Sequence, residues 1–152
     1  ETKKKGELEI KKCKKNYVNL RLPGVITSKP AINRPWLSKI INLISKNKNI
    51  KVFNSNKPFN NFIDSYEIFL VLLHLMKEKK IRKTLEISAS KPHKLKELLF
   101  YIIKYLDSYS QVEFLNNGSD HKIIDNRNFI NKTGIKLNTT MHILKRILKY
   151  YD

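Results

Sequence analysis

Apolar residues along this chain follow two spacings, one typical of amphipathic helices and the other of half-buried strands. In residues 35–46 and 92–106 they recur at positions i, i+1, i+4, i+5 and i+8, which form one face of a helix. In residues 50–54 and 111–115 they alternate with polar residues, as in a strand with one buried face. The second helix and strand repeat the apolar positions of the first at a spacing of 62 residues. The pattern therefore predicts two similar units.

Both units are predicted to run in the order strand, helix, strand, short strand, helix. The first would place these elements at residues 19–27, 35–46, 50–54, 60–63 and 64–80. The second would place them at 81–88, 92–106, 111–115 and 122–124, with helices to the end of the chain. Ser-Lys-Pro occurs at the strand-to-helix turn of each unit, at 28–30 and 90–92. An ancient duplication and two unrelated amphipathic helices with a shared period explain this match equally well.

The expected fold class is α+β, with two β-α-β-β-α units at residues 17–80 and 81–152. A basic flexible arm, residues 1–16, would precede them, since it combines lysine clusters with few apolar residues. In the first unit, Asp64 and Glu67 form a capping-box pattern before a helix that is apolar on nearly every face. This helix is predicted to be the buried spine of the fold, and Trp36 is predicted to lie in the core.

The C-terminal stretch predicts a helix-turn-helix motif. Asp125 would cap a helix at 126–133, Gly134 would form the turn, and Asn138 would cap a second helix at 139–151. Ile130 and Thr133 depart from the usual pattern, and the hairpin predicted at 111–124 precedes the motif, whereas the wing of a winged helix follows it. The outer face of the second helix would meet DNA through Thr139, Thr140, His142, Lys145, Arg146 and Lys149.

Charge favours a polyanionic partner. The sequence contains 31 Lys and Arg against 13 Asp and Glu, a formal net charge of +18. Only five of the basic residues are Arg, which suits phosphate contact better than base readout. The remaining predicted nucleic-acid contacts are Lys3, Lys4, Lys5, Lys11, Lys12, Lys14, Lys15, Lys79, Lys80, Arg82, Lys83, Lys91, Lys94, Arg127 and Lys136.

Candidate catalytic chemistry is sparse. The four histidines lack metal-ligand spacing, the four glycines form no phosphate-binding loop, and a single cysteine excludes an intrachain disulfide. Asp64 and Asp125 occupy equivalent places in the two units and could form a two-metal nuclease site, although helix capping explains both better. No cofactor, no metal and no membrane-spanning segment are predicted, and an enzyme is not expected.

Residues 70–88, LVLLHLMKEKKIRKTLEIS, and the helix and hairpin after them resemble the helix-then-strand layout of LAGLIDADG homing endonucleases and maturases. The likeness covers residues 70–130 at most. Lys77–Lys80 replace the acid and glycine that this family carries at the helix end. The resemblance therefore implies a relative that holds nucleic acid without cleaving it.

These observations lead to an expected function of non-catalytic nucleic-acid binding inside the cell, with duplex DNA held by the basic surface and the C-terminal helix pair. An RNA-binding structural protein of an AT-rich or organellar ribosome is the alternative, and a metal-dependent or degenerate homing-endonuclease-like nuclease is the minor one. Protein partners in a larger assembly are also expected.

Overall fold

The structure is a computed structural model that describes residues 2–12, 15–27, 35–78, 82–115 and 122–151. Their helices and strands are interspersed along the chain and form one continuous core. In chain order they are α1 (Thr2–Lys12), β1 (Tyr17–Arg21), β2 (Gly24–Ile26), α2 (Trp36–Ser45), β3 (Ile50–Phe53), β4 (Pro58–Phe59), β5 (Phe62–Asp64), α3 (Ser65–Leu75), β6 (Arg82–Glu86), β7 (His93–Lys94), α4 (Leu95–Tyr105), β8 (Val112–Leu115), α5 (Arg127–Thr133) and α6 (Thr140–Leu148).

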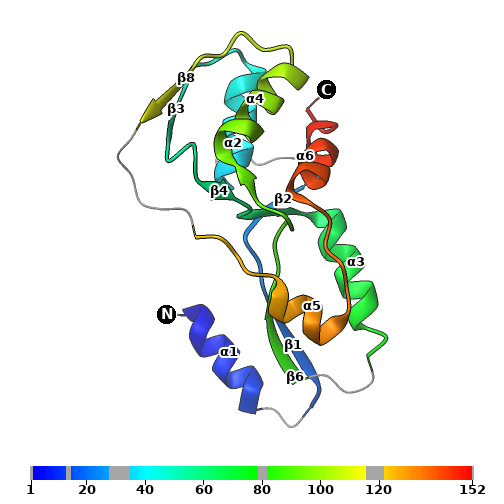
Figure 1. Cartoon of the computed structure of the whole chain (residues 1–152). Coiled ribbons are helices and arrows are strands. Elements are labelled where there is room, and N and C mark those ends of the chain that lie inside the picture. Colours follow the sequence, from blue (N-terminus) through cyan, green and yellow to red (C-terminus); the bar gives the residue numbers. More distant parts are fainter. Residues whose placement is uncertain (1, 13–14, 28–34, 79–81, 116–121, 152) are drawn as a thin grey trace.

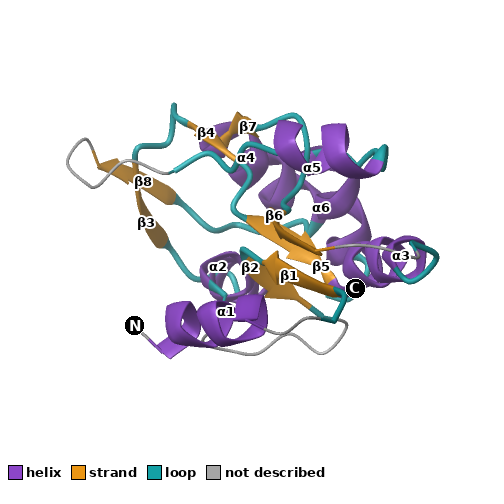
Figure 2. Ribbon diagram, turned by 90° about the horizontal axis from the view of Figure 1, so that it is seen from below, coloured by secondary structure: helices purple, strands orange, loops and turns teal. Residues whose placement is uncertain are grey.

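One part of the molecule is built on the parallel pair β1–β6, in which Tyr17 lies opposite Arg82 and Arg21 opposite Glu86. Helix α3 belongs to the long connection between these two strands, as parallel pairing requires a crossover. Helix α1 contacts β1 and α5 contacts β6. Both views place α1 on one side of the strand pair and α3 on the other (Figures 1 and 2).

The other part holds the two amphipathic helices and a second parallel pair. Helices α2 and α4 pack together, and β3 pairs with β8 so that Ile50 lies opposite Val112 (Figure 1). This register reproduces the 62-residue spacing of the sequence, because the two strands predicted as equivalents are hydrogen-bonded to each other. The short pairs β2–β5, which is parallel, and β4–β7, which is antiparallel, complete the strand pairing of the described residues.

The predicted core faces of α2 and α4 are confirmed. Most apolar side chains that follow the i, i+1, i+4, i+5, i+8 spacing are buried, namely Leu37, Ile40, Ile41 and Ile44 on α2 and Leu98, Leu99 and Ile102 on α4, whereas Ile103 and Leu106 are half-buried. Trp36, in contrast, is 40% exposed, so its predicted place in the core is wrong. It begins α2 and lies at the rim of a cleft.

Helix α3 is not the buried spine that its composition predicts. Asp64 caps it as predicted, accepting a hydrogen bond from the Glu67 backbone N–H at 2.9 Å. Within the helix, however, only Glu67, Val71 and Leu75 are buried. Ile68 packs partly against the core, and the other large apolar side chains of the helix are at least two-fifths exposed. No described helix is long and apolar enough to cross a membrane.

The predicted helix-turn-helix is wrong. Helix α5 ends at Gly134, whose φ of +69° suits glycine at a helix C-terminus. The chain then runs alongside Ser90, where Thr139 forms a bridge, before α6 begins. As a result α5 packs on β6 while α6 packs on α4 and β5 (Figure 1). The N-cap of α6 is Thr139 and not Asn138, since the Thr139 hydroxyl accepts a hydrogen bond from the His142 backbone N–H.

The predicted hairpin before this motif is also wrong as far as it is described. Strand β8 pairs with β3, and residues 122–126 form no strand. Residues 116–120, the predicted turn, lie outside the described residues, as does the first Ser-Lys-Pro at 28–30.

Residues expected to be a flexible arm form helix α1. The helix buries none of its residues. The carboxylate of Glu7 ties it to β1 through two hydrogen bonds from the Arg21 guanidinium, both 2.8 Å long. These hydrogen bonds hold the pKa of Glu7 below its ordinary value. An ion pair therefore joins the N-terminal helix to β1.

Candidate functional site: a buried charge cluster and two clefts

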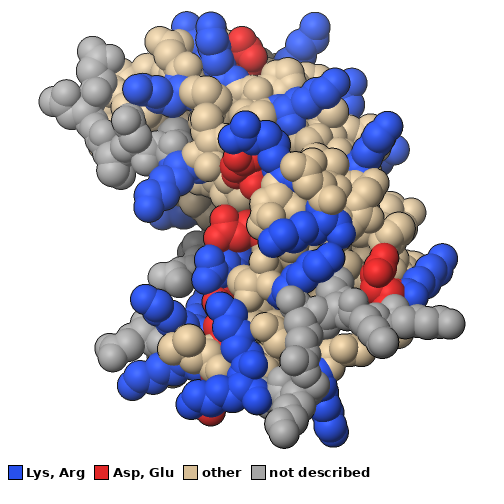
Figure 3. Space-filling view, turned by 60° about the horizontal axis from the view of Figure 1, so that its bottom comes forward, with Lys and Arg blue, Asp and Glu red and all other residues tan. Residues whose placement is uncertain are grey.

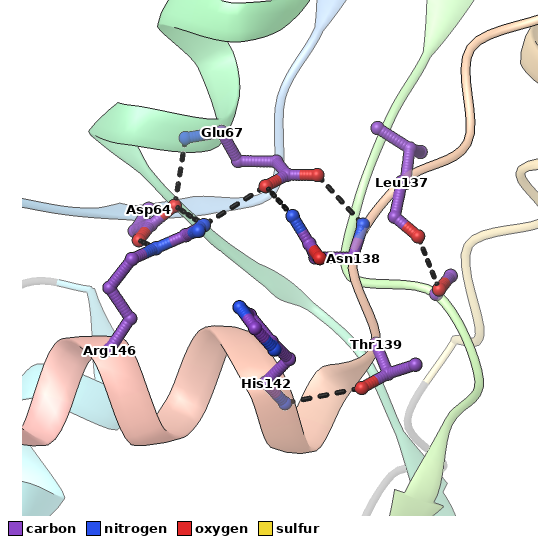
Figure 4. Close-up of polar contacts among 8 residues, drawn as sticks. Asp64, Glu67, Leu137, Asn138, Thr139, His142 and Arg146 are labelled. Carbon is purple, nitrogen blue, oxygen red and sulfur yellow. Dashed lines mark hydrogen bonds and ion pairs between the residues drawn. The ribbon is translucent and has the colours of Figure 1, made fainter.

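A buried charge cluster joins α3 to α6. The Arg146 guanidinium, on α6, forms hydrogen bonds with both oxygens of Asp64 and with Oε2 of Glu67, the latter at 2.9 Å (Figure 4). Asp64 is fully buried and the Arg146 side chain is 19% exposed. The Tyr66 ring covers the guanidinium, with 4.8 Å between the guanidinium carbon and the ring centroid.

The cluster is closed by Asn138, which precedes α6. Its backbone N–H and its side-chain amide donate to the two oxygens of Glu67 at 2.7 and 2.8 Å (Figure 4). Burial by itself would lower the pKa of Arg146, but the hydrogen bonds to the two carboxylates outweigh it and raise the pKa above its ordinary value. With every carboxylate oxygen engaged, the arrangement serves as a structural connection between two helices.

The two aspartates considered for a metal site do not share one. Asp64 belongs to the buried cluster, whereas Asp125 is exposed and pairs with the Arg127 side chain at 2.6 Å. That hydrogen bond keeps the pKa of Asp125 below its ordinary value. Within the described residues, no group of three or more His, Cys, Asp or Glu side chains could hold a metal ion.

Two of the clefts formed by the described residues bear on function, and the larger of these, of about 630 Å³, has a basic rim. Lys91, Arg127 and Lys136 line it, so the structure brings together three of the predicted basic contacts. Its floor contains the side chains of Asn60 and Asn126. Both side-chain amides form hydrogen bonds within the protein. That of Asn60 joins residues 88–89 to residue 124, and that of Asn126 binds the backbone of Ser88. The floor is therefore structural, and the rim is exposed.

The smaller cleft, of about 360 Å³, has an aromatic wall and an unpartnered polar atom. Trp36 and Phe59 meet edge to face, with ring centroids 5.6 Å apart, and Asn61 lies beside them. The side-chain oxygen of Asn61 is buried and has no hydrogen-bond partner among the residues that the structure describes. Gly24 completes the wall, because a Cβ there would lie 2.6 Å from the Pro35 Cβ. Apolar walls with one convergent polar group are typical of small-ligand sites.

Most other predicted basic contacts are scattered over the surface (Figure 3). The exposed lysines comprise Lys3, Lys4, Lys5, Lys11 and Lys12 on α1, Lys15, Lys94 on β7, Lys145 on α6, where His142 is also exposed, and Lys149 at the C-cap of that helix. Lys83 donates to the Lys132 carbonyl. Lys14, Lys79 and Lys80 lie outside the described residues, and of Arg82 only the backbone, in β6, is described.

The predicted outer face of the last helix is wrong for two residues. Thr140 is fully buried, and its hydroxyl donates to the Ser90 carbonyl at 2.8 Å. Arg146 lies in the buried charge cluster. Glu67, the partner of both Arg146 and Asn138, lies more than 70 residues before each of them, so spacing alone offered no signal for these contacts. Trp36 and Asn61 were missed as cleft residues because an isolated Trp beside Leu37 is typical of a core.

Comparison with known proteins identifies the fold. No family model matches the sequence, and no curated protein matches it. Among solved structures, the UDP-N-acetylglucosamine 4-epimerase of Methanobrevibacter ruminantium matches 98% of this chain with a TM-score of 0.78 and 20% identity. The UDP-glucose 4-epimerase of Thermotoga maritima matches 98% with a TM-score of 0.78 and 12% identity. The enzyme WbmG of Bordetella bronchiseptica, in complex with NAD and UDP, matches 97% with a TM-score of 0.74 and 16% identity.

The chain shares their fold. It is the Rossmann-like fold of sugar-nucleotide epimerases and dehydratases. The matched parts cover 51%, 51% and 48% of the three solved chains, so this chain spans about half the length of the structures it matches. The predicted fold class, two α+β units ending in a helix-turn-helix, is therefore wrong.

The expected function is corrected by the same finding. An almost end-to-end match to epimerases contradicts non-catalytic nucleic-acid binding, both as a duplex-DNA binder and as a ribosomal protein. It also contradicts the nuclease alternative and the resemblance to homing endonucleases. The expectation that the protein is not an enzyme is overturned too, because the matched fold is that of enzymes.

Some of the matched structures are named as complexes with NAD. A dinucleotide pyrophosphate binds to a glycine-rich turn that opens a helix. The described glycines lie apart, Gly6 within α1, Gly24 at the start of β2 and Gly134 at the end of α5. The described residues thus do not fit the dinucleotide.

Proposed function

We propose that this chain forms part of a sugar-nucleotide-modifying enzyme of the epimerase or dehydratase type. The observation that carries the proposal is the fold match over 97–98% of the chain to enzymes whose names include UDP-sugars. The proposed role of the chain is to hold the nucleotide end of the substrate. Chemistry at the sugar would need the dinucleotide-binding part of such an enzyme.

The small cleft has the chemistry for a pyrimidine ring. A nucleobase presents a flat face to aromatic side chains, and stacking of this kind contributes about 1–3 kcal/mol per base. Trp36 and Phe59 supply the aromatic wall. Asn61 lines the same cleft, and a side-chain amide can exchange a hydrogen bond with the polar edge of uracil.

Binding of UDP can be measured directly, because Trp36 is the single tryptophan of the chain and lines the cleft. Titration with UDP, UDP-glucose and UDP-N-acetylglucosamine should change its fluorescence with one saturable phase. Asn61→Ala removes one hydrogen bond, so affinity should fall about tenfold. Asn131→Ala, on the exposed surface of α5, is the matched control and should bind as the wild type does. Unchanged affinity for the Asn61 variant would exclude this cleft as the nucleotide site.

A further inference from the structure

The larger cleft is a second candidate site, which the proposed nucleotide role leaves unused. Its volume of about 630 Å³ lies in the range of small-ligand pockets, about 300–1,000 Å³. It is formed by residues 90–92, 123–127 and 136–137, together with Asn60 and Ile130. None of the residues that line it also lines the small aromatic cleft. The two clefts are therefore separate candidate sites.

Two lysines without an acidic partner give the rim of this cleft its positive charge. Lys91 and Lys136 are exposed, and neither ammonium group forms a hydrogen bond or ion pair within the part of the chain that the structure describes. Arg127 is neutralised by Asp125, the single acidic residue among the described residues of the lining. The rim therefore carries a net charge of +2, three cations minus one carboxylate. A concave surface with an excess of one charge concentrates ligands of the opposite charge.

The two lysines are held at the same rim by a hydrogen bond between their neighbours. The Ser90 hydroxyl donates to the Leu137 carbonyl at 2.8 Å, although these residues are 47 positions apart in the sequence. The Ser90 backbone N–H also donates to the Asn138 carbonyl at 2.9 Å. The backbone beside Lys91 and Lys136 is thus fixed without a ligand, which reduces the cost of ordering it on binding.

Lys91 has a backbone conformation that is unusual for its residue type. Its φ is +48°, in the left-handed region. The other described non-glycine residues with positive φ are Asn47, Asn54 and Asp107, and short polar side chains of this kind tolerate that region. Strain of this sort persists where the surrounding structure imposes it, and it is common at ligand sites. A ligand that needs the ammonium group explains why a lysine occupies a position that suits glycine or asparagine better.

The walls of the cleft are mainly apolar. The described residues that form them include Pro92, Ile124, Ile130 and Leu137, and the adjoining Ile123 is 50% exposed. An inorganic ion would leave these side chains in contact with water, whereas an organic anion would cover them, and burial of apolar surface favours binding. The walls therefore favour a ligand in which an apolar body carries the charged group.

We propose that the larger cleft binds a small organic anion, namely a carboxylate or a phosphate ester with an apolar body. Its charged group contacts Lys91 and Lys136, because compact ammonium groups suit both kinds of anion. Its apolar body packs against Ile123 and Ile130. This site is distinct from the proposed nucleotide site, so the proposal does not depend on UDP binding in the small cleft.

Nuclear magnetic resonance titration of the isotope-labelled full chain tests the proposal. Phenyl phosphate and phenylacetate serve as probes for the two kinds of head group, inorganic phosphate lacks the apolar body, and benzyl alcohol lacks the charge. At least one organic anion should shift the backbone amide signals of residues 90–91, 123–127 and 136–137 to saturation. It should bind roughly tenfold or more tightly than inorganic phosphate and benzyl alcohol.

Three results of this titration would overturn the proposal. The first is that neither organic anion reaches saturation at these amides. The second is that inorganic phosphate binds as tightly as the organic anions, since the cleft would then hold an adventitious ion only. The third is that UDP displaces the bound probe, because the cleft would then be part of the nucleotide site.

Two charge-matched variants separate the cleft from the net charge of the chain. Lys136→Gln removes an ammonium group from the rim, so affinity for the organic anion should fall about tenfold. Lys132→Gln removes the same charge from an exposed position on α5 that does not line the cleft, and affinity should stay unchanged. Equal losses for the two variants would attribute binding to net charge and contradict the proposal.

Lys91→Gly distinguishes a role in ligand binding from a role in folding. Glycine adopts a φ of +48° without strain, so the melting temperature of the variant should not fall. Loss of the ammonium group should still weaken binding of the organic anion about tenfold. A variant that binds the anion as tightly as the wild type would show that Lys91 does not serve the ligand, and the proposal would be wrong.

Discussion

The most constrained single residue is Arg146, because it satisfies two carboxylates that have almost no access to water. A planar guanidinium with five N–H donors can engage Asp64 and Glu67 at once, which a lysine ammonium cannot do with the same geometry. The cluster has a net charge of −1 in a protein of net charge +18. Arg146 is thus withdrawn from the basic surface and used to hold α6 against α3.

Removing one member of this cluster should cost much of the stability. Asp64→Ala removes two of the hydrogen bonds that the buried guanidinium of Arg146 donates and also removes the cap of α3, so the free energy of unfolding should fall by about 3–5 kcal/mol. Urea denaturation followed by circular dichroism measures this loss. Asp125→Ala, which removes an exposed partner of Arg127, should have a much smaller effect. Equal losses for the two variants would contradict a structural role for the cluster.

At the scale of elements, α3 shows how an apolar helix can have two different faces. Its capping by Asp64 and its length follow from local residues. Which side chains are buried depends on what surrounds the helix, and the described part of the chain covers only a narrow stripe. A helix that is apolar all round is expected to be buried, so the exposed apolar side chains of α3 mark a surface suited to contact with another polypeptide.

Adjacent residues on α3 provide a direct comparison of the two faces. Val71 is 1% exposed, and Val71→Ala should lower the free energy of unfolding by about 2 kcal/mol through lost packing. Leu72 is 44% exposed, and Leu72→Ala should change it by less than about 0.5 kcal/mol in the isolated chain. Thermal or urea unfolding distinguishes them. A larger loss for Leu72→Ala would show that its side chain is covered in solution.

At the scale of the whole molecule, the strand pairs join the two halves of the chain. Strand β1 pairs with β6, β3 with β8 and β4 with β7, so each strand of the first half in these pairs has its partner in the second. The buried charge cluster adds a further link, from residue 64 to residue 146. Stability should therefore be shared across the chain.

Expression of residues 17–80 alone tests this sharing. Because β1, β3 and β4 lose their partners, the fragment should lack a cooperative unfolding transition and the dispersed amide spectrum of a folded protein. The full chain should unfold in a single transition. A fragment that folds cooperatively by itself would support independent units at 17–80 and 81–152.

The sequence alone determined the features that short-range physics controls. The spacing of apolar residues predicted the buried faces of α2 and α4, Asp64 was recognised as a helix cap, and Gly134 was placed at a turn. Each depends on residues within about two helical turns of one another. The 62-residue spacing also held, as the register of β3 against β8.

Only the tertiary structure decided which distant segments meet. The path of residues 134–139 along Ser90 separates α5 from α6 and removes the helix-turn-helix, although both helices lie close to their predicted positions. The charge cluster, the aromatic cleft and the exposed face of α3 arise from contacts, or missing contacts, between residues tens of positions apart. Local propensity specifies helices and turns, whereas the pairing of distant segments depends on which apolar surfaces fit together in space. The net charge of the chain carries no information about that pairing.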